Sequence, residues 1–409
     1  MKKLVLCLVV LTAVNVTFGQ RAKKVLFVIV DGISADVIEK LNTPGLDSIS
    51  AVGGYTRAHV GGEKAGYSET PTISAVGYNS LLTGTWVNKH NVWDNDIAAP
   101  NYAYPTIFRL FREQYPEKKI AVFSSWLDNR TKLVGDGLAS TGNLHVDYHY
   151  DGLELDSVRF PQDEAREFMH KIDESVVDTA AAYIRKYSPD LSWVYLEYTD
   201  DMGHGFGDSE QFYRSIGYMD KQMARLWSAI KFREQQFGED WQIYITTDHG
   251  RHAKDGKEHG GQTDRERLTW IVTNAGSLNS YFKSGNAGIV DIMPSIASHL
   301  GVKMSPEIAR EVDGVSLTGK ISAVSATATL NGKVLKLGWT PVNSVGKVKI
   351  WVSETNNFKT GGHDEYKLLG EASVKSAGTE ITITGAPSKF YKIALEFPMN
   401  TLNRWVIVK

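Results

Sequence analysis

The sequence predicts an α/β fold with a mainly parallel sheet and helices on both faces, followed by a smaller all-β sandwich. Continuous apolar runs predict the sheet, because strands covered on both faces lack polar alternation. Amphipathic helical patterns separate these runs, as is typical of parallel sheets. After about residue 320 the pattern changes to short alternating segments between turn residues, which predicts the sandwich.

The strands and helices of the first part follow in order along the chain. The expected strands are residues 24–31, 119–124, 193–198, 241–246 and 268–272. Between them, apolar residues recur on one helical face over 165–183, which Pro189 closes off, and again over 212–230. Asp208 or Ser209 is the expected cap of the second helix. In such folds, ligands gather at the carboxyl ends of the strands.

Two further regions have a different character. Residues 134–161 are rich in Gly, Asp, His and Tyr without a clear period, and they predict a long loop or small insertion near the site. Alternating segments after residue 320 predict the strands of the sandwich. These are residues 327–330, 334–339, 348–352, 380–383, 391–397 and 405–408.

The N-terminus has the pattern of a secretory signal peptide. A basic start, residues 1–3, precedes an apolar run from Leu4 to Phe18, and the small Gly19 follows. This run is shorter than the roughly 20 residues that span a bilayer, so we expect a periplasmic or secreted protein with no transmembrane span in the mature chain. The only cysteine, Cys7, lies within the run, which predicts a mature protein without disulfides or thiolate ligands.

Composition excludes one class of function. The chain has 409 residues, 42% hydrophobic, which is enough for a large core and more than one domain. Its formal charge is −2 at pH 7, so the sequence gives no sign of the basic surface that nucleic-acid binding requires.

Three of the expected strands run into an aspartate. Asp31 follows the first, Asp200 follows the strand expected at 193–198, and Asp248 follows the strand at 241–246. Two histidines extend the pattern, His204 four residues after Asp200 and His249 directly after Asp248. Oxygen and imidazole groups from distant parts of the chain therefore meet at one edge of the sheet, as in a metal site.

This series, with a hydroxyl-rich helix start after Asp31 and His259 in Glu-His-Gly-Gly after Asp248, resembles the alkaline phosphatase superfamily. It is closest to the nucleotide pyrophosphatase/phosphodiesterase (type I phosphodiesterase) branch. The resemblance covers roughly residues 24–317. The expected organisation is a signal peptide (1–19), an alkaline phosphatase-like metal-dependent catalytic domain (22–318) and a fibronectin III/Ig-like β-sandwich (320–409).

The resemblance implies two divalent metal ions, with zinc expected and Mn²⁺ as the alternative. One metal would be held by Asp31, Ser74, Asp248 and His249. The other would be held by Asp200, His204 and His259. A metal lowers the pKa of a serine hydroxyl so that it can attack phosphorus and form a phosphoserine intermediate.

The nucleophile lies in the segment Ser68-Glu69-Thr70-Pro71-Thr72-Ile73-Ser74. Alignment with the family pattern Pro-Thr-x-Thr/Ser, followed by Thr-Gly and Asp-Asn, selects Ser74, while Thr70 and Thr72 stay open as alternatives. The same alignment makes Asn95 the donor to a non-bridging phosphate oxygen. Without the family pattern, Asn95 is a turn residue and the hydroxyls are helix caps.

Two departures from family patterns bear on the substrate. Ala75 stands where phosphodiesterases often place an aromatic residue after the nucleophile. Some monoesterases grip the extra phosphate charge with Lys-x-Arg, and here Arg130 remains as a candidate phosphate clamp while Asp128 replaces the lysine. The missing lysine favours a phosphodiesterase over the alternative, an alkaline phosphomonoesterase. Phosphoester small molecules, lipid head groups and phosphorylated glycans are all candidate substrates.

Other functions are less consistent with the sequence. A sulfatase would carry Cys/Ser-x-Pro-x-Arg near Ser74, which is absent. A cofactor-independent phosphoglycerate mutase would have neither a signal peptide nor a β-sandwich. An inactive, metal-stabilised binding ectodomain is a third alternative, but Ser74 is retained and structural zinc normally has four closed ligands.

Overall fold

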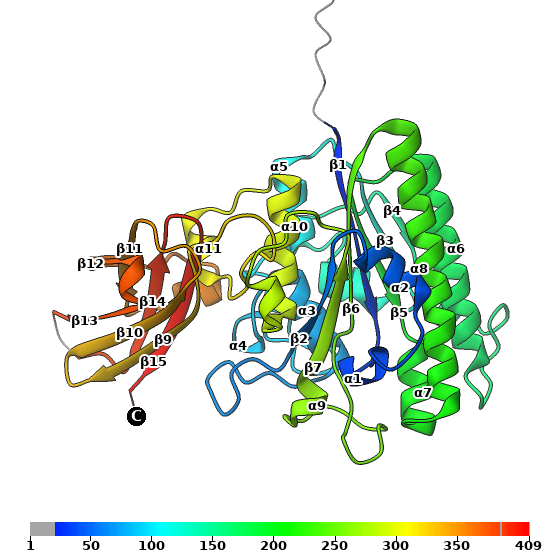
Figure 1. Cartoon of the computed structure of the whole chain (residues 1–409), viewed down its shortest axis with the longest axis horizontal. Coiled ribbons are helices and arrows are strands. Elements are labelled where there is room, and N and C mark those ends of the chain that lie inside the picture. Colours follow the sequence, from blue (N-terminus) through cyan, green and yellow to red (C-terminus); the bar gives the residue numbers. More distant parts are fainter. Residues whose placement is uncertain (1–20, 385–386, 409) are drawn as a thin grey trace, which may run out of the picture.

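The computed structural model describes residues 21–384 and 387–408, so the predicted signal peptide lies outside the described residues (Figure 1). Residues 23–288 contain an eight-stranded sheet. Its strand order is β4 (Tyr148–Tyr150), β3 (Ile120–Ser124), β5 (Leu191–Leu196), β1 (Lys23–Val30), β6 (Asp240–Thr246), β7 (Leu268–Thr273), β2 (Gly54–His59) and β8 (Ala287–Gly288). Strand β7 is antiparallel to both β6 and β2, and the other neighbours are parallel.

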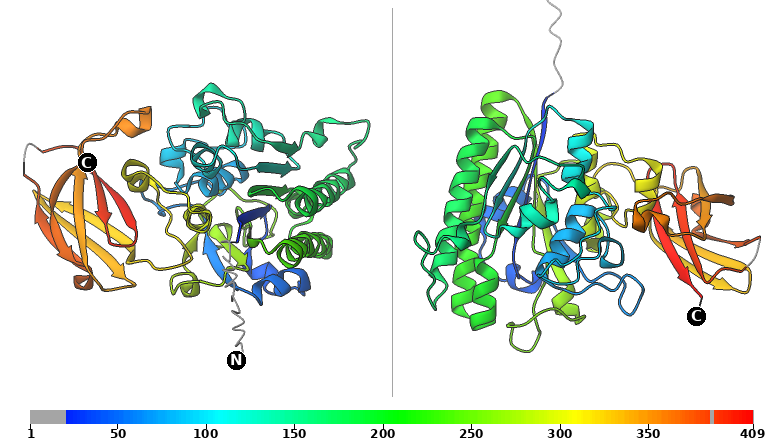
Figure 2. Two further views of the ribbon diagram at one scale, coloured as in Figure 1. Left: turned by 90° about the horizontal axis from the view of Figure 1, so that it is seen from above. Right: turned by 180° about the vertical axis from the view of Figure 1, so that it is seen from behind.

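Helices cover both faces of this sheet, and Figures 1 and 2 show α6 and α8 on one side and α3, α5 and α10 on the other. The described α-helices are α1 (Ala35–Ile38), α2 (Pro44–Ser50), α3 (Ser74–Thr83), α4 (Val87–His90), α5 (Ile107–Gln114), α6 (Glu167–Tyr187), α7 (Tyr198–Phe206), α8 (Glu210–Phe237), α9 (Asp264–Arg267), α10 (Ile292–Leu300) and α11 (Pro306–Glu311). Short π- and 3₁₀-helices are η1 (Asn129–Val134), η2 (Ala139–Thr141), η3 (Leu153–Leu155), η4 (Phe282–Ser284), η5 (Ile289–Asp291), η6 (Asn357–Thr360) and η7 (Val374–Ser376). The predicted α/β class is therefore confirmed.

Strand β1 shows why the apolar runs are continuous. Alternate residues of a strand point to opposite faces, and here both faces are buried. Val25, Phe27 and Ile29 pack into the core beneath α3, α5 and α10. Leu26 and Val28 pack on the other side, against α2, α6 and α8. Every apolar residue of β1 is therefore buried. The strand lies in the middle of the sheet, and Asp31 follows its carboxyl end.

The structure corrects one predicted strand. The strand expected at 193–198 ends at Leu196, and α7 begins at Tyr198, so Asp200 lies in the first turn of a helix rather than at a strand end. Asp173 fixes this early turn, because its carboxylate accepts hydrogen bonds from the backbone N–H groups of Glu197 (3.2 Å) and Tyr198 (2.9 Å). The predicted insertion at 134–161 contributes the edge strand β4, and Ser209 caps α8 by accepting from the N–H of Phe212.

The C-terminal part consists of two antiparallel sheets, as predicted. One has the order β13 (Gly378–Thr382), β10 (Val334–Pro341) and β9 (Ala323–Asn331). The other has the order β12 (Lys367–Ser373), β11 (Lys347–Ser353), β14 (Phe390–Glu396) and β15 (Thr401–Ile407). A shared apolar core, which includes Trp339, Ile350 and Ile393, lies between them.

Buried charges join this sandwich to the α/β part. The Lys392 ammonium on β14 donates to Glu311 of α11 and to Asp364 (2.7 Å), and its side chain is only 2% exposed. In the opposite direction, Lys89 of α4 donates to Asp313 (2.6 Å) and to the Asn403 side chain of β15 (2.9 Å). These paired groups hold the two parts in one arrangement.

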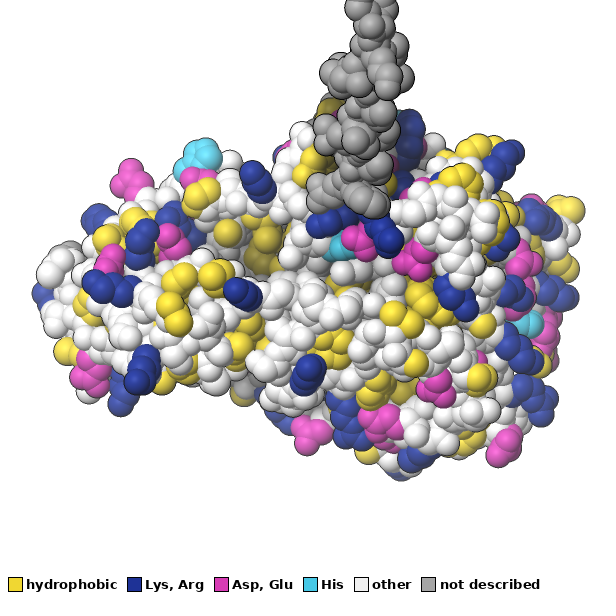
Figure 3. Space-filling model, turned by 45° about the horizontal axis from the view of Figure 1, so that its top comes forward, with side chains coloured by type: hydrophobic (Ala, Val, Ile, Leu, Met, Phe, Trp, Pro, Cys, Tyr) yellow, Lys and Arg dark blue, Asp and Glu magenta, His cyan; other side chains and the backbone are white. Residues whose placement is uncertain are grey.

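The surface carries charges of both signs. On the face shown in Figure 3, Lys and Arg side chains are interspersed with Asp and Glu, and no continuous basic area is visible among the described residues. None of the helices in residues 21–384 and 387–408 combines the length and apolar character that a membrane span needs.

Candidate metal centre

The site forms at the carboxyl ends of β1 and β6, which are parallel neighbours with Ile29 opposite Thr246. Asp31 follows β1 directly, and Asp248 and His249 follow β6, so the three side chains meet. The N–H of Gly32 donates to Asp248 Oδ1 (3.2 Å) and ties the two strand ends together. Gly32 has φ +70°, and a Cβ there would lie 2.5 Å from the Asp200 carboxylate, so only glycine fits.

Two tyrosines orient the Asp31 carboxylate. The hydroxyls of Tyr78, on α3, and Tyr195, on β5, both donate to Oδ2, the latter at 2.7 Å. The other oxygen, Oδ1, is buried and has no hydrogen-bond partner among the described residues. Asp248 Oδ2 is in the same situation. Buried carboxylate oxygens that form no hydrogen bond are costly. In the described chain only the His249 imidazole lies within ion-pair distance of these two oxygens, and a bound cation would satisfy both.

His249 lies at the centre of the cluster and is fully buried. Its Nε2 is 3.2 Å from Asp31 Oδ1, 3.3 Å from Asp248 Oδ2 and 3.3 Å from Ser74 Oγ. Burial alone would lower the pKa of His249, but the charges of Asp248, Asp31 and Asp200 outweigh it and raise this pKa to about 9. The crowded carboxylates thus attract positive charge at this point.

A second group of ligand atoms surrounds Asp200. His204 Nε2 is 3.2 Å from Asp200 Oδ2 and 3.1 Å from His259 Nε2, so both imidazole nitrogens converge on the same space. His259 Nδ1 lies 2.8 Å from the Thr72 carbonyl oxygen, and its ring stacks on that of His249 with centroids 3.6 Å apart. The two geometric clusters, Asp31-Asp248-His249 and Asp200-His249-His259, share His249, while His204 borders the second.

Arg251 is a site residue that the sequence pattern did not reveal. Its side chain is fully buried, and its guanidinium forms an ion pair with Asp200 Oδ1. It also donates to the carbonyls of Gly32 (2.8 Å), Lys257 (2.9 Å) and Asp200 (2.9 Å). Burial alone would raise the pKa of Asp200, but the charge of Arg251 and the hydrogen bond with His204 hold it below its usual value. In the sequence, only the position of Arg251 directly after Asp248-His249-Gly250 indicated that it lies near the site.

Ser74 is the first residue of α3, and its hydroxyl faces the cluster beside His249. The two alternative hydroxyls are used elsewhere. Thr70 donates to the Ser68 carbonyl (2.8 Å) and accepts from the N–H of Val87. Thr72 donates to the Gly261 carbonyl (2.9 Å) and accepts from the N–H of Gly260, next to His259.

The remaining two predicted residues lie in different settings. Asn95 is exposed, and its side-chain carbonyl accepts from the N–H of Ala75 (3.0 Å), immediately after Ser74.

Arg130 lies in η1, where Asp151 accepts two of its hydrogen bonds (2.6 and 3.1 Å) and Asp136 accepts a third (2.7 Å). Its charge is therefore compensated within the protein. This geometry supports a structural role for Arg130 rather than a phosphate clamp.

The donor set fits divalent metals. Three carboxylates and three imidazoles come together, with two buried oxygens left without donors and two imidazole nitrogens facing one another. Oxygen and nitrogen ligands of this kind suit zinc, and equally Mn²⁺.

Comparison with known proteins places the chain in a family. The family model described as type I phosphodiesterase/nucleotide pyrophosphatase matches residues 25–283. A search of curated proteins finds no match.

Solved structures share the fold at low identity. Human ectonucleotide pyrophosphatase/phosphodiesterase 5 is 14% identical with a TM-score of 0.49, covering 69% of this chain and 96% of that chain. A putative sulfatase from Bacteroides thetaiotaomicron is 12% identical with a TM-score of 0.51, over 88% and 84% of the two chains. A 2-O GAG sulfatase is 11% identical with a TM-score of 0.50, over 91% and 85%. The family match, which spans well over half of the chain, and the shared alkaline phosphatase-like fold agree: the chain belongs to the type I phosphodiesterase/nucleotide pyrophosphatase family, and is thus a hydrolase of the alkaline phosphatase superfamily.

Proposed function

We propose that the protein is an exported phosphodiesterase that uses two divalent metal ions, with zinc expected, and Ser74 as its nucleophile. One observation carries the proposal: the Ser74 hydroxyl lies 3.3 Å from His249 Nε2, beside buried carboxylate oxygens that form no hydrogen bond within the described residues. Thr70 and Thr72 make other hydrogen bonds, which favours Ser74 over both. Export is inferred from the N-terminal residues 1–19, and their cleavage leaves the catalytic (22–318) and sandwich (320–409) domains.

The proposed ligands are Asp31, Ser74, Asp248 and His249 for one metal and Asp200, His204 and His259 for the other. When bound, the metals would lower the pKa of the serine hydroxyl and neutralise phosphate charge. Tyr78 and Tyr195 orient one of these ligands by holding Oδ2 of Asp31, and Arg251 orients another by holding Asp200. Residues beyond the ligands thus keep their donor atoms aimed at the site.

The chain's own groups account for the covalent steps. The Ser74 oxygen loses its proton and forms a bond to phosphorus as the bond to the leaving oxygen breaks. The leaving oxygen takes up a proton and departs as an alcohol, which leaves a phosphoserine that still carries the second ester group. Water then attacks the phosphoserine, so that Ser74 leaves and the phosphate monoester is released. The side-chain carbonyl of Asn95 accepts from the Ala75 N–H next to Ser74, so its NH₂ group would be the one to donate to a phosphate oxygen. The N-terminus of α3 adds its positive dipole end.

The charge environment favours a diester over a monoester. A monoester carries an additional negative charge, and the Arg130 guanidinium that was the candidate partner is already bound by Asp136 and Asp151. Arg251 is likewise fully engaged with Asp200 and backbone carbonyls. Candidate diesters occur among nucleotide derivatives, lipid head groups and phosphorylated glycans.

The test is the ratio of kcat/KM for an aryl phosphodiester to that for the matching monoester, on zinc-loaded protein. We expect a ratio well above one. Ser74→Ala should reduce diester turnover on the order of a thousandfold or more with bound zinc largely retained, because a nucleophile is lost but most ligands remain. Thr70→Val, which removes only an alternative hydroxyl, should retain most of the turnover.

Each other outcome has a definite meaning. Unchanged turnover in Ser74→Ala would rule out this nucleophile. A ratio well below one would make the enzyme a phosphomonoesterase. No turnover of either ester by fully zinc-loaded protein would support a binding ectodomain.

A further inference from the structure

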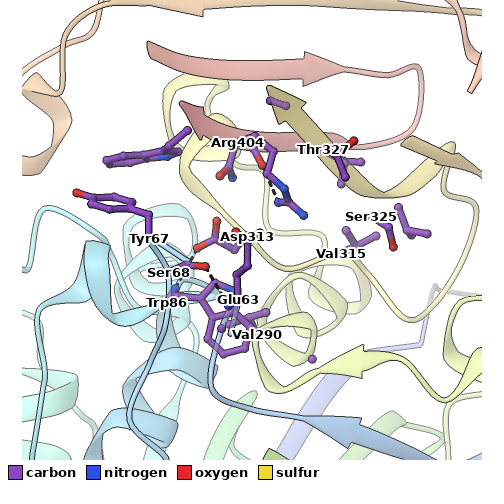
Figure 4. A pocket seen from close by; sticks show the side chains of 18 of the residues that line it. Glu63, Tyr67, Ser68, Trp86, Val290, Asp313, Val315, Ser325, Thr327 and Arg404 are labelled. Atoms are coloured by element: carbon purple, nitrogen blue, oxygen red, sulfur yellow. Dashed lines mark hydrogen bonds between the residues drawn. The ribbon is translucent and has the colours of Figure 1, made fainter. Parts of the chain in front are cut away.

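A cleft of about 720 Å³ lies between the α/β part and the β-sandwich, on residues that play no part in the metal centre (Figure 4). One wall comes from the loop after β2 and from residues around α4, including Ser68 and Trp86. The facing wall comes from β9 and β15 of the sandwich, including Thr327 and Arg404. This volume is in the range of clefts that bind organic ligands.

The cleft is preformed because both walls are fixed. The hydrogen bond from Lys89 to the Asn403 side chain and the buried ion pair of Lys392 with Glu311 connect the two parts. At the rim, the ring of Tyr67 stacks on that of Trp405 with centroids 5.0 Å apart, which connects the loop after β2 to β15. A ligand would therefore meet an organised surface rather than a hinge, which lowers the entropic cost of binding.

Hydroxyl groups line the sandwich wall. Ser325, Thr327 and Thr329 alternate along β9 and are all exposed, while their neighbours Val324 and Ala326 are buried. Ser325 adopts φ 55° at the point where the register between β9 and β10 shifts, from Gly338 to Thr340. A bulge of this kind re-aims a side chain, and a left-handed serine is a strained residue of the sort that clusters at binding sites.

Arg404 supplies an uncompensated charge. Its Nη1 donates to the neighbouring Asn403 carbonyl (2.8 Å), and no carboxylate of the described chain lies within ion-pair distance. Figure 4 shows its guanidinium projecting from β15 into the space between the walls. Aromatic rings lie nearby, with Trp86 tilted against His59 (centroids 6.1 Å) and Tyr67 45% exposed at the rim.

We propose that this cleft binds an oligosaccharide whose acidic group, a carboxylate or sulfate, pairs with Arg404. Sugars combine hydroxyl groups with apolar C–H faces, and the cleft offers hydroxyl and guanidinium donors together with aromatic rings. The exposed Glu63 carboxylate also lines the cleft and would accept hydrogen bonds from sugar hydroxyls. The site is distinct from the proposed hydrolytic centre, and it would hold the enzyme on an acidic glycan.

The test is isothermal titration of the zinc-loaded protein lacking residues 1–19 with three hexasaccharides. Chondroitin sulfate carries carboxylates and sulfates, hyaluronan carries carboxylates alone, and maltohexaose is neutral. We expect saturable binding of at least one acidic hexasaccharide, weakened by added salt, and binding of maltohexaose at least tenfold weaker. The better acidic ligand identifies which group Arg404 recognises.

Three variants separate this site from general effects. Arg404→Gln should weaken acidic binding at least tenfold, while Lys336→Gln, which removes an exposed charge from the same sandwich outside the cleft, should change it less than twofold. Ser325→Gly should weaken binding severalfold yet leave the thermal midpoint unchanged or higher, because glycine relieves the left-handed strain. Ser74→Ala should bind normally, since the cleft is independent of hydrolysis.

Three results would overturn the proposal. They are absence of saturable binding to both acidic hexasaccharides, equal affinity for maltohexaose, and an equal loss in Arg404→Gln and Lys336→Gln.

Discussion

Arg251→Met tests how far the metal centre depends on a residue that is not itself a ligand. The substitution keeps an apolar side chain against Phe212 but removes the ion pair with Asp200 and three hydrogen bonds to carbonyls. Residues that orient metal ligands typically contribute about 10- to 100-fold to metal affinity. That range corresponds to about 1.4–2.7 kcal/mol of zinc binding free energy.

The metal-free protein should be affected as well. Removing one partner of a buried ion pair costs about 3–5 kcal/mol, because the Asp200 carboxylate is left without its counter-charge. The pKa of Asp200 should rise, since the charge of Arg251 is the main influence that opposes burial and keeps this pKa low. A carboxyl group whose pKa is lower in the folded than in the unfolded protein stabilises the fold above its unfolded pKa, and this stabilisation is lost as the pH falls. In Arg251→Met the pKa of Asp200 is no longer held low, so the part of the acid-induced loss of stability that comes from Asp200 should be smaller.

The assay is competition for zinc with a chromophoric chelator, combined with urea unfolding after EDTA treatment. Arg265→Met is the matched control. Arg265 is largely buried, with a side chain that is 13% exposed, and it pairs with Asp36 (3.2 Å) and Asp208 (2.8 Å), neither of which is a candidate ligand. It should lose stability but keep zinc affinity within about twofold. Parental zinc affinity in Arg251→Met, or an equal loss of affinity in Arg265→Met, would refute the reasoning.

Two other predictions follow from buried side chains. Tyr195→Phe should weaken zinc binding about tenfold in the same competition assay, because Asp31 Oδ2 loses a donor at 2.7 Å; unchanged affinity would mean that Tyr78 alone fixes the carboxylate. His90 is fully buried, its Nδ1 accepts from the Val92 N–H (3.1 Å), and burial lowers its pKa to about 3. Its folded pKa is below the unfolded value of about 6.5, so stability is lost as pH falls from about 6.5 towards 3, by about 2 kcal/mol at pH 5. The check is urea unfolding of EDTA-treated protein at pH 7 and pH 5. Between these pH values the free energy of unfolding should fall by about 2 kcal/mol less in His90→Asn than in the parental protein. An equal fall in both proteins would contradict this assignment.

The sequence predicted those parts of the site that local pattern determines. Asp31, Asp248 and His249 follow strands whose apolar content is unmistakable, and parallel neighbours must bring their carboxyl ends together. Asp200 was predicted at a strand end but lies in α7, since the apolar run at 193–198 crosses the boundary between strand and helix. Periodicity does not distinguish these structures over so few residues.

Other features depend on contacts between distant segments. Tyr78 and Tyr195 read as ordinary core residues in sequence, and only the fold brings their hydroxyls to Asp31. The antiparallel direction of β7 also depends on the fold, because the connection over residues 247–267 is long enough for a parallel crossover, and it is the structure that shows α9 as its one short α-helix. The short strands β4 and β8 have too few residues to form a pattern.

The two buried lysines at the boundary between the parts, Lys89 and Lys392, have a consequence for the engineering of this architecture. Lys392 of the sandwich forms an ion pair with Glu311, and Lys89 of the α/β part donates a hydrogen bond to the Asn403 side chain of the sandwich. Each part therefore contains a buried charge whose partner lies in the other part. The α/β part expressed alone would expose Glu311 without its counter-ion. A chimera that joined it to a sandwich from another lineage would fold well only if that sandwich carried an equivalent lysine. Joining the two parts is therefore not sufficient to reproduce this arrangement, because the paired residues on both sides of the boundary are needed as well.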